Sequence, residues 1–429
     1  MLWLLISLLS LAKLANAQPP LSLNEALRMG TTNNADLQTA IQREEIAQTN
    51  RLFGVPQRLP SLDLRLSQDN FVNQYNSPTN FVRGIYQDNS LGGGISGSWL
   101  LYNGGGVTMG QTRLNQLNQR ASLETQAVRQ QVSQAIIAAY YRVVVEIAKR
   151  AVRAEGVALS KARWVDFGQQ ERLGKVSLFD VLQAENLFLT DSTTYLKQEI
   201  DVQIAQNQLH TAIGWNQFGP VFLTDSLTLD PQPPAFSNMP GKLLSLNFTL
   251  RSQRMGVLIA TNAVQLQRTA LAPVIRLNSA LYQSFTGTKF SDLPRIDGNS
   301  TSLLLAGFSV VLPLFQRETR RAIRQTELEQ KLSQTAIKKT ERQYLAEADR
   351  LSRSYQIQAR IVALSDLLVS NTARSLAIAR QRLQSNFSSL LEYRSTQLAY
   401  TEAKLNRLQA LYELRLIDTS AKQLIGTLN

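Results

Sequence analysis

The spacing of apolar residues changes between two kinds of pattern along this chain. In residues 61–75, Leu62, Leu64 and Leu66 alternate with polar neighbours, and residues 90–102 alternate in the same way. A period of two predicts strands with one apolar and one polar face. From Val107 to about residue 171, and again over 178–213, apolar residues recur at spacings of three, four and seven. This spacing predicts two long helices.

Proline and glycine are missing where the helical spacing holds. No proline lies between Pro78 and Pro220 or after Pro313, and Gly426 is the only glycine in the last 115 residues. Both residue types disfavour helix interiors, and globular helices average only about 11–12 residues. The sequence therefore predicts unusually long helical hairpins in place of a conventional compact core.

The same order of elements occurs twice. The segment beginning at Pro60 corresponds to the one beginning at Pro273, at an offset of 213, and Gly214 corresponds to Gly426 at an offset of 212. A near-constant offset indicates tandem duplication. We predict a first repeat over 18–219, a proline-rich linker over 220–240 and a second repeat over 241–429. Each repeat contains a helix, a β-hairpin (61–102; 274–314) and a long helical hairpin (107–213; 317–425).

The first helix is expected to run unbroken from an N-cap at Ser22 to Phe53, and the corresponding one over about 241–270. Residues 1–17 resemble a secretory signal peptide, with an apolar run from Leu2 to Ala12 and an Ala-Asn-Ala cleavage site before Gln18. No other uninterrupted apolar run is long enough to span a bilayer as a helix.

Candidate chemistry is sparse. The chain has no cysteine and a single histidine, His210, without ligand partners at metal-binding spacing. Gly104-Gly-Gly106 lacks the Lys-Ser/Thr of a phosphate loop. The formal net charge is +13, but the basic residues are spread along the helices, which is typical of solvated faces and not of nucleic-acid binding. We therefore expect no catalytic, cofactor or metal site, no nucleic-acid partner, and a protein that is not an enzyme.

Four strands are too few to close a barrel, and open strand edges cannot lie in lipid. Both difficulties disappear if several chains share one barrel, with lipid on the apolar face and water on the polar face. Aromatic residues near the predicted strand ends would form an interface girdle: Trp99, Tyr102, Tyr282, Phe308 and Phe315. Two alternatives stay open at this point, a coiled-coil surface protein and an exported enzyme.

The ordered motifs resemble the TolC-type outer-membrane efflux protein family (outer membrane factors). The matching segments are Leu23-Asn-Glu-Ala-Leu27, Asn33-Asn-Ala-Asp-Leu37, Leu59-Pro60, Trp99-Leu-Leu-Tyr-Asn-Gly-Gly105, Gly174-Lys-Val-Ser-Leu-Phe-Asp-Val-Leu-Gln-Ala-Glu185 and 209–214. Two positions depart from the family pattern. Asn386 stands where the first repeat has its turn glycine, and Gln316-Arg-Glu318 replaces the Asp/Asn-Gly-Gly signature after the fourth strand.

The resemblance implies a mixed fold, in which a homotrimer shares a 12-stranded transmembrane β-barrel in the outer membrane of a Gram-negative bacterium. Its helical hairpins would form an α-barrel in the periplasm. A periplasmic adaptor (membrane fusion) protein would connect this duct to an inner-membrane RND, ABC or MFS pump, in efflux or type I secretion.

The resemblance also places the entrance and the adaptor-docking surface at the two helical tips. These map to Arg172, Leu173, Gly174, Lys175, Val176 and Ser177, and to Leu383, Ser385, Asn386, Ser388 and Ser389. Asp180 and Glu392 are candidate gate residues. Two explanations of these acids remain, stabilisation by the helix macrodipole and a charged ring at the mouth of the duct.

Overall fold

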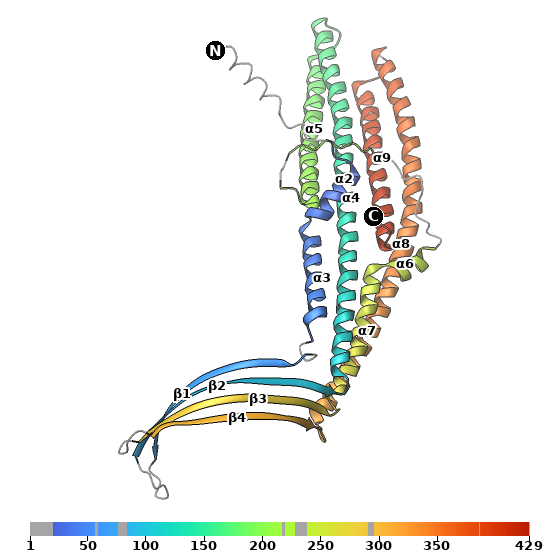
Figure 1. Ribbon diagram of the computed structural model, residues 1–429. Coiled ribbons are helices and arrows are strands. Elements are labelled where there is room, and N and C mark those ends of the chain that lie inside the picture. The colour runs from blue at the N-terminus through green and yellow to red at the C-terminus, as the bar shows by residue number, and fades with distance from the viewer. Residues whose placement is uncertain are drawn as a thin grey trace, which may run out of the picture. The chain divides into compact units, whose positions relative to one another are not determined.

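The computed structural model describes residues 20–55, 59–75, 84–216, 219–227, 238–290, 296–385 and 387–428 (Figure 1). The predicted signal peptide, residues 228–237 of the proline-rich linker and Asn386 lie outside these residues. The chain divides into two compact units. One contains residues 1–42, 123–251 and 339–429, and the other contains residues 43–122 and 252–338. Both repeats contribute to each unit.

The second unit contains a four-stranded antiparallel sheet with the strand order β1-β2-β3-β4. Its strands are β1 (Ser61–Tyr75), β2 (Gly84–Asn103), β3 (Val274–Phe290) and β4 (Ile296–Val311). The two predicted hairpins therefore meet in one sheet, through the pairing of β2 with β3. Among the described residues, the outer edges of β1 and β4 pair with no other strand.

The strands are longer than the alternating pattern predicts. β2 begins at Gly84, ahead of the alternation that starts at residue 90, and the polar residues 84–89 and 286–290 belong to strands. The ladder hydrogen bonds between β1, β2 and β3 hold these polar residues in strand conformation although their composition is typical of loops. At its far end β4 stops at Val311 and not near residue 314, since Pro313 has no N–H to donate to a ladder.

Four long helices form two hairpins. They are α4 (Gly106–Arg172) with α5 (Leu178–Ile213), and α8 (Arg317–Gln384) with α9 (Leu390–Leu424). The core of the first unit is built from α2 (Leu23–Asn33), α4, α5 and the C-terminal end of α9, with Ile136, Tyr140 and Leu209 fully buried. Tyr140 donates its hydroxyl to Asp225 Oδ2 at 2.9 Å, which ties the 219–227 segment to this core. Burial is the main cause that raises the Tyr140 pKa to about 12.

The helix that precedes each hairpin is broken by an asparagine, so the prediction of unbroken helices was wrong. The first consists of α2 (Leu23–Asn33) and α3 (Ala35–Phe53), and the second of α6 (Met239–Leu246) and α7 (Phe248–Thr269). Asn34 accepts the Leu37 N–H and donates to the carbonyl of Ala212. Asn247, 213 positions later, accepts the Leu250 N–H at 2.8 Å and donates to Leu424 O at 2.8 Å.

The glycine that ends each helical hairpin packs closely against the break in the short helix. Gly214 and Gly426 have left-handed backbones, with φ of +68° and +72°. A Cβ on Gly214 would lie 2.7 Å from the carbonyl oxygen of Asn33, and one on Gly426 would lie 3.0 Å from that of Leu246. Each helical hairpin thus ends where the short helix breaks, and the asparagine side chain joins the two.

Replacing Asn247 by Ala is expected to lower the free energy of unfolding by about 1–3 kcal/mol, because it leaves the buried Leu424 carbonyl without its donor. Thermal unfolding of the purified protein would measure this. Asn238→Ala is the matched control, since Asn238 caps α6 without a side-chain hydrogen bond. Equal stability of the two variants would contradict the assigned role.

Candidate functional site: an apolar sheet face and two helical tips

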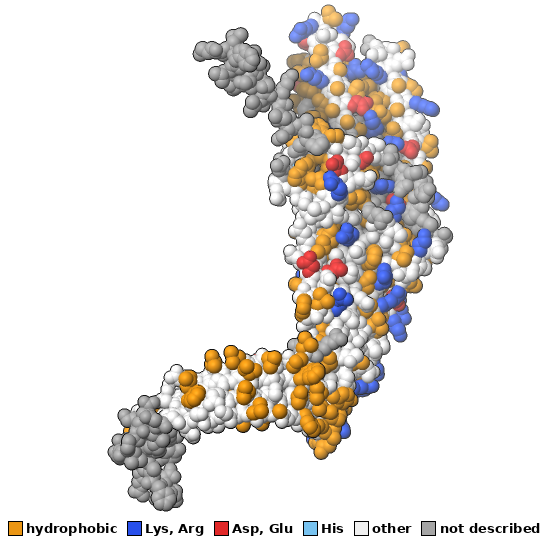
Figure 2. Space-filling view, viewed as in Figure 1, with side chains coloured by type: hydrophobic (Ala, Val, Ile, Leu, Met, Phe, Trp, Pro, Cys, Tyr) orange, Lys and Arg blue, Asp and Glu red, His pale blue; other side chains and the backbone are white. Residues whose placement is uncertain are grey.

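One face of the sheet is apolar and exposed. The pairing register places Leu64, Ile95, Leu281 and Leu304 in one row across all four strands. Their exposed fractions are 71%, 51%, 57% and 79%. A second row, nearer the helical end of the strands, contains Trp99, Leu277 and Phe308. Figure 2 shows hydrophobic side chains gathered along the sheet. So large an exposed apolar surface marks a contact with lipid or protein.

The opposite face is mainly polar. It carries Asp63, Arg65, Ser67, Ser96, Ser98, Asn278 and Thr301, with Leu303 and Leu305 as exceptions. Tyr282 also lies on this face, where its ring packs over Gly94; a Cβ on that glycine would lie 2.7 Å from the ring. The prediction that Tyr282 belongs to an aromatic girdle on the apolar face is therefore wrong. Trp99, Tyr102 and Phe308 are exposed near the helical end of the strands, and Phe315 lies beyond the end of β4.

The first helical tip is a tight turn built on Gly174. The Gly174 N–H donates to Glu171 O at 2.8 Å and the Lys175 N–H to Gln170 O at 2.9 Å, a pattern that ends α4 with a left-handed residue. Gly174 has that conformation, with φ of +67°. Ser177 then caps α5. Arg172, Leu173 and Lys175 are exposed and Val176 is half-buried.

The second tip closes in a similar way. The Phe387 N–H donates to Arg382 O at 2.9 Å, and Ser389 caps α9 by accepting the Glu392 N–H at 3.2 Å. Ser385 and Ser388 lie in the turn. Leu383 is only 9% exposed and packs against Ala379 and Tyr393. Leu383 thus belongs to the interior of the hairpin and not to a docking surface.

The two candidate gate residues are each held within their own tip. Asp180 accepts the Ser177 N–H at 3.1 Å and the Ser177 hydroxyl at 2.6 Å, which completes a capping box. Glu392 accepts the Ser388 hydroxyl at 2.7 Å and forms an ion pair with Arg382 at 3.4 Å. In the described part of the chain no hydrogen bond or ion pair joins Asp180 to Glu392. Local capping therefore accounts for the position of both acids within one chain.

Two contacts near the tips connect one hairpin to the other, and neither is predicted by the sequence. Arg394 of α9 donates two hydrogen bonds to the Asp191 carboxylate of α5, at 2.7 and 2.6 Å. The two side chains are only 9% and 14% exposed. Arg163 of α4 lies over the ring of Tyr393, with 5.0 Å between the guanidinium carbon and the ring centroid. No sequence signal indicates either pair, because their members are about 200 residues apart and are not related by the repeat.

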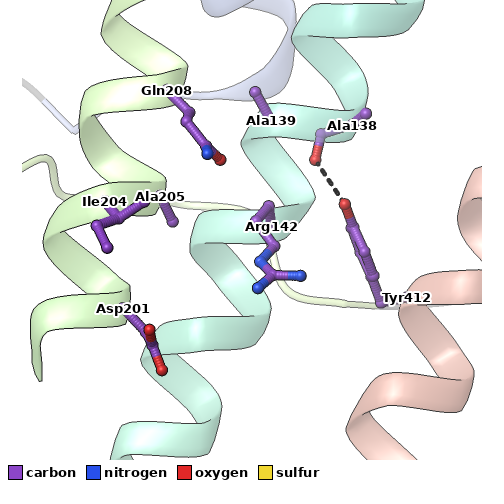
Figure 3. Close-up of a pocket in the computed structure, with 8 residues that line it drawn as sticks. All are labelled: Ala138, Ala139, Arg142, Asp201, Ile204, Ala205, Gln208 and Tyr412. Carbon is purple, nitrogen blue, oxygen red and sulfur yellow. Dashed lines mark hydrogen bonds between the residues drawn. The ribbon is translucent and has the colours of Figure 1, made fainter. Parts of the chain in front are cut away.

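A groove further along the helices shows no catalytic arrangement. It is lined by Ala138, Ala139, Arg142, Asp201, Ile204, Ala205, Gln208 and Tyr412, from α4, α5 and α9 (Figure 3). Arg142 lies over the Tyr412 ring, whose hydroxyl donates to Ala138 O at 3.4 Å.

The single histidine, His210, lies outside this groove. It is 1% exposed and packs edge-on against Trp215, and burial lowers its pKa. Within the described ranges, no three His, Cys, Asp or Glu side chains could hold a metal ion.

Long apolar stripes on the helices are exposed in the part of the chain that the structure describes. On α8 the exposed residues Ile357, Ile361, Leu364 and Leu368 recur at spacings of four, three and four, and α5 carries a comparable stripe at Leu182, Leu189 and Leu196. By length and composition α8 contains an 18-residue stretch apolar enough to cross a membrane, 6% of it buried. A single such stretch is weak evidence for a span. The heptad-like spacing indicates helix–helix packing instead.

An exposed apolar sheet face and exposed apolar stripes on long helices are the features expected of one subunit of a membrane channel. Comparison with known proteins shows what the chain is similar to. Residues 239–427, the second repeat, match the model of the outer membrane efflux protein family. No curated protein sequence matches this chain.

Solved structures of outer membrane channels share the fold. The CmeC channel of Campylobacter jejuni is 15% identical and superposes with a TM-score of 0.77, over 94% of this chain and 85% of that one. VceC of Vibrio cholerae is 16% identical, with a TM-score of 0.74 over 94% and 96%. The open state of Neisseria gonorrhoeae MtrE is 16% identical, with a TM-score of 0.73 over 95% and 89%.

The resemblance to the TolC-type outer-membrane efflux family is thereby confirmed, as is the mixed fold of β-hairpins with long helical hairpins. The match to the outer membrane efflux protein family covers residues 239–427, and the predicted location in the outer membrane agrees with that match.

Proposed function

We propose that this protein is the outer-membrane exit duct of a tripartite efflux or type I secretion system. It would conduct substrate passively from an inner-membrane pump and a periplasmic adaptor to the exterior. The observation that carries the proposal is the four-stranded sheet, which exposes one apolar face and whose two edges have no strand partner among the described residues. In lipid every strand edge needs a partner, so the sheet requires further copies to close.

A homotrimer with a shared 12-stranded barrel satisfies this requirement. The β1 edge of one copy would pair with the β4 edge of the next, and the polar face would line a water-filled lumen. The same arrangement gives the stripes on α5 and α8 helix partners from neighbouring copies, which supports a periplasmic α-barrel. A coiled-coil surface protein would use the stripes but has no use for an apolar sheet face.

The shared barrel can be tested by disulfide cross-linking, because the chain has no cysteine of its own. Leu64→Cys in β1 would be combined with Leu304→Cys in β4, and Ser302→Cys and Ala306→Cys would sample neighbouring registers. Within one chain β1 and β4 are three strand spacings apart, about 14 Å, too far for a disulfide. We expect covalent dimers and trimers and nothing larger. Monomers only, or a ladder that continues beyond three, would contradict the trimer.

We propose further that the two tips form the entrance and bind the adaptor. Exposed apolar side chains support this, since Leu173, Leu178 and Phe179 at the first tip and Phe387 and Leu391 at the second are 63–77% exposed. Polar contacts around them would come from Arg172, Lys175, Ser177, Ser385, Ser388 and Ser389. Apolar anchors with a polar surround are typical of protein interfaces.

Replacing Asp180 and Glu392 together by Ala is expected to raise the resting conductance of the duct, because both tips lose the hydrogen bonds that order them. Single-channel recording measures this. Asp180→Asn with Glu392→Gln is the control that removes the charges but keeps oxygen acceptors. A higher conductance of the Ala variant alone would show that capping keeps the entrance narrow. A higher conductance of both variants would show that the negative charges keep it narrow. Unchanged conductance in both variants would exclude these residues as gate elements.

A further inference from the structure

The corner where β4 passes into α8 carries the sequence departure Gln316-Arg-Glu318, and its surroundings suggest a role. Four arginines follow within eight residues, at 317, 320, 321 and 324. The spacing i, i+3, i+4, i+7 places them on one face of α8. All four are exposed. The half-buried positions of this part of α8, such as Ala322, Thr326 and Gln330, lie on the opposite face, where Gln330 donates to Thr261 of α7.

These arginines are mostly without acidic partners. Arg324 pairs with Glu327 at 3.2 Å, while in the described ranges Arg317, Arg320 and Arg321 form no ion pair. Helix stability does not explain them either, because cations are unfavourable in the first turns of a helix. Arg317 lies over the ring of Phe315, 5.6 Å from its centroid.

The arginine face continues directly from an apolar surface. Between the end of β4 and Arg317 lie Leu312, Leu314 and Phe315, which are 53%, 85% and 73% exposed. Before them comes the row of Trp99, Leu277 and Phe308. Figure 2 shows Lys and Arg side chains beside the hydrophobic side chains at the α8 end of the sheet. Membrane proteins show the same order where they pass from the hydrocarbon core to the lipid headgroups: apolar side chains come first, then aromatic residues, then cations.

We propose that Arg317, Arg320, Arg321 and Arg324 bind the phosphates of anionic phospholipids in the periplasmic leaflet of the outer membrane. The inference rests on the proposed placement of the sheet in the bilayer. A basic segment beside a membrane is attracted to anionic lipid by about 1 kcal/mol for each Lys or Arg near the surface, so the positive charge is the property that the lipid recognises. The corner would thereby fix the depth of the sheet relative to this leaflet.

The test uses the tryptophan that lies closest to the proposed site. Besides Trp99, the chain after residue 17 contains only Trp164 and Trp215, which lie on or next to the helices α4 and α5. The full-length mature protein would be reconstituted in phosphatidylcholine vesicles that contain increasing fractions of brominated phosphatidylglycerol or brominated phosphatidylcholine. Quenching of Trp99 then reports the relative affinity of the two lipids at the protein surface.

The wild-type protein is expected to prefer brominated phosphatidylglycerol by at least roughly five-fold at low salt, the effect of about one well-placed cation, with a smaller preference at high salt. Arg317→Gln, Arg320→Gln and Arg321→Gln combined should abolish the preference, and the corresponding triple Lys variant should keep it. The matched control neutralises Lys338, Lys339 and Arg342, three exposed cations further along α8, and should leave the preference unchanged.

A triple Gln variant that keeps the full preference would overturn the proposal, and so would a triple Lys variant that loses it. Single-channel recording of the same reconstituted variants separates this question from the proposed function. Channels that conduct without a lipid preference would leave the duct intact and remove the lipid site. Absence of conductance in all variants, also when each is combined with Arg394→Ala to widen the entrance, would instead contradict the duct.

Discussion

Replacing Ile95 by Arg is expected to prevent the sheet from inserting into a bilayer, whereas Arg at the neighbouring position 96 is expected to be tolerated. Ile95 lies in the middle row of the apolar face, between Leu64 and Leu281, and is 51% exposed. A lipid-facing Arg near the middle of a transmembrane barrel costs about 2–4 kcal/mol in each chain. In a homotrimer this cost occurs three times in one barrel.

Ser96 gives a matched control because it is the next residue of the same strand and lies on the opposite, polar face, beside Asp63. Urea titration of folding into vesicles, with the heat-modifiable band on gels as the readout, measures both variants. Similar losses for Ile95→Arg and Ser96→Arg would show that the sheet does not have one lipid-facing side. The membrane assignment would then fail.

Replacing Arg394 by Ala is the second change with a large expected effect. Its guanidinium holds the Asp191 carboxylate with two hydrogen bonds, and both side chains are nearly buried. Removing one member of such a pair leaves the other without a partner and typically costs about 3–5 kcal/mol. Since the pair joins α9 to α5, we expect a lower melting temperature of the oligomer. We also expect a higher resting conductance, because the hairpins near the entrance are no longer held together.

The exchanged pair Arg394→Asp with Asp191→Arg is expected to restore part of both properties, while Asp191→Ala alone should resemble Arg394→Ala. Arg350→Ala serves as the control for losing an arginine, because its pair with Glu347 is within α8 and exposed. Exposed pairs of this kind contribute little to stability. A loss from Arg350→Ala as large as that from Arg394→Ala would contradict the special role of the hairpin contact.

The sequence alone predicts much of this fold because the helical hairpins are governed by local rules. The long helices follow from the apolar spacing and the missing prolines, and Ser22 caps the first helix as expected. The helix breaks at Asn34 and Asn247 were missed because no proline marks them. Their cause is a distant carbonyl, of Ala212 or Leu424, that only the folded chain brings near.

The candidate site was predictable to a smaller extent. Alternation alone identified the apolar face at Leu62, Leu64 and Leu66, but it could not assign Tyr282, whose side depends on its pairing with Gly94. The tips followed from the resemblance. The resemblance did not predict the ion pair of Arg394 with Asp191 near the tips. These residues lie 203 positions apart, and the repeat offset does not connect them.

Single-channel recording of the purified mature protein in a planar bilayer tests the central claim most directly. A transmembrane duct that is narrow at its helical tips should give discrete but small current steps, and Arg394→Ala should give larger ones. Arg394→Ala is included because a sealed entrance would abolish the current of the wild-type protein but not the current of this variant. Folded oligomers of both proteins that produce no steps would contradict a membrane-spanning duct and favour a coiled-coil surface protein.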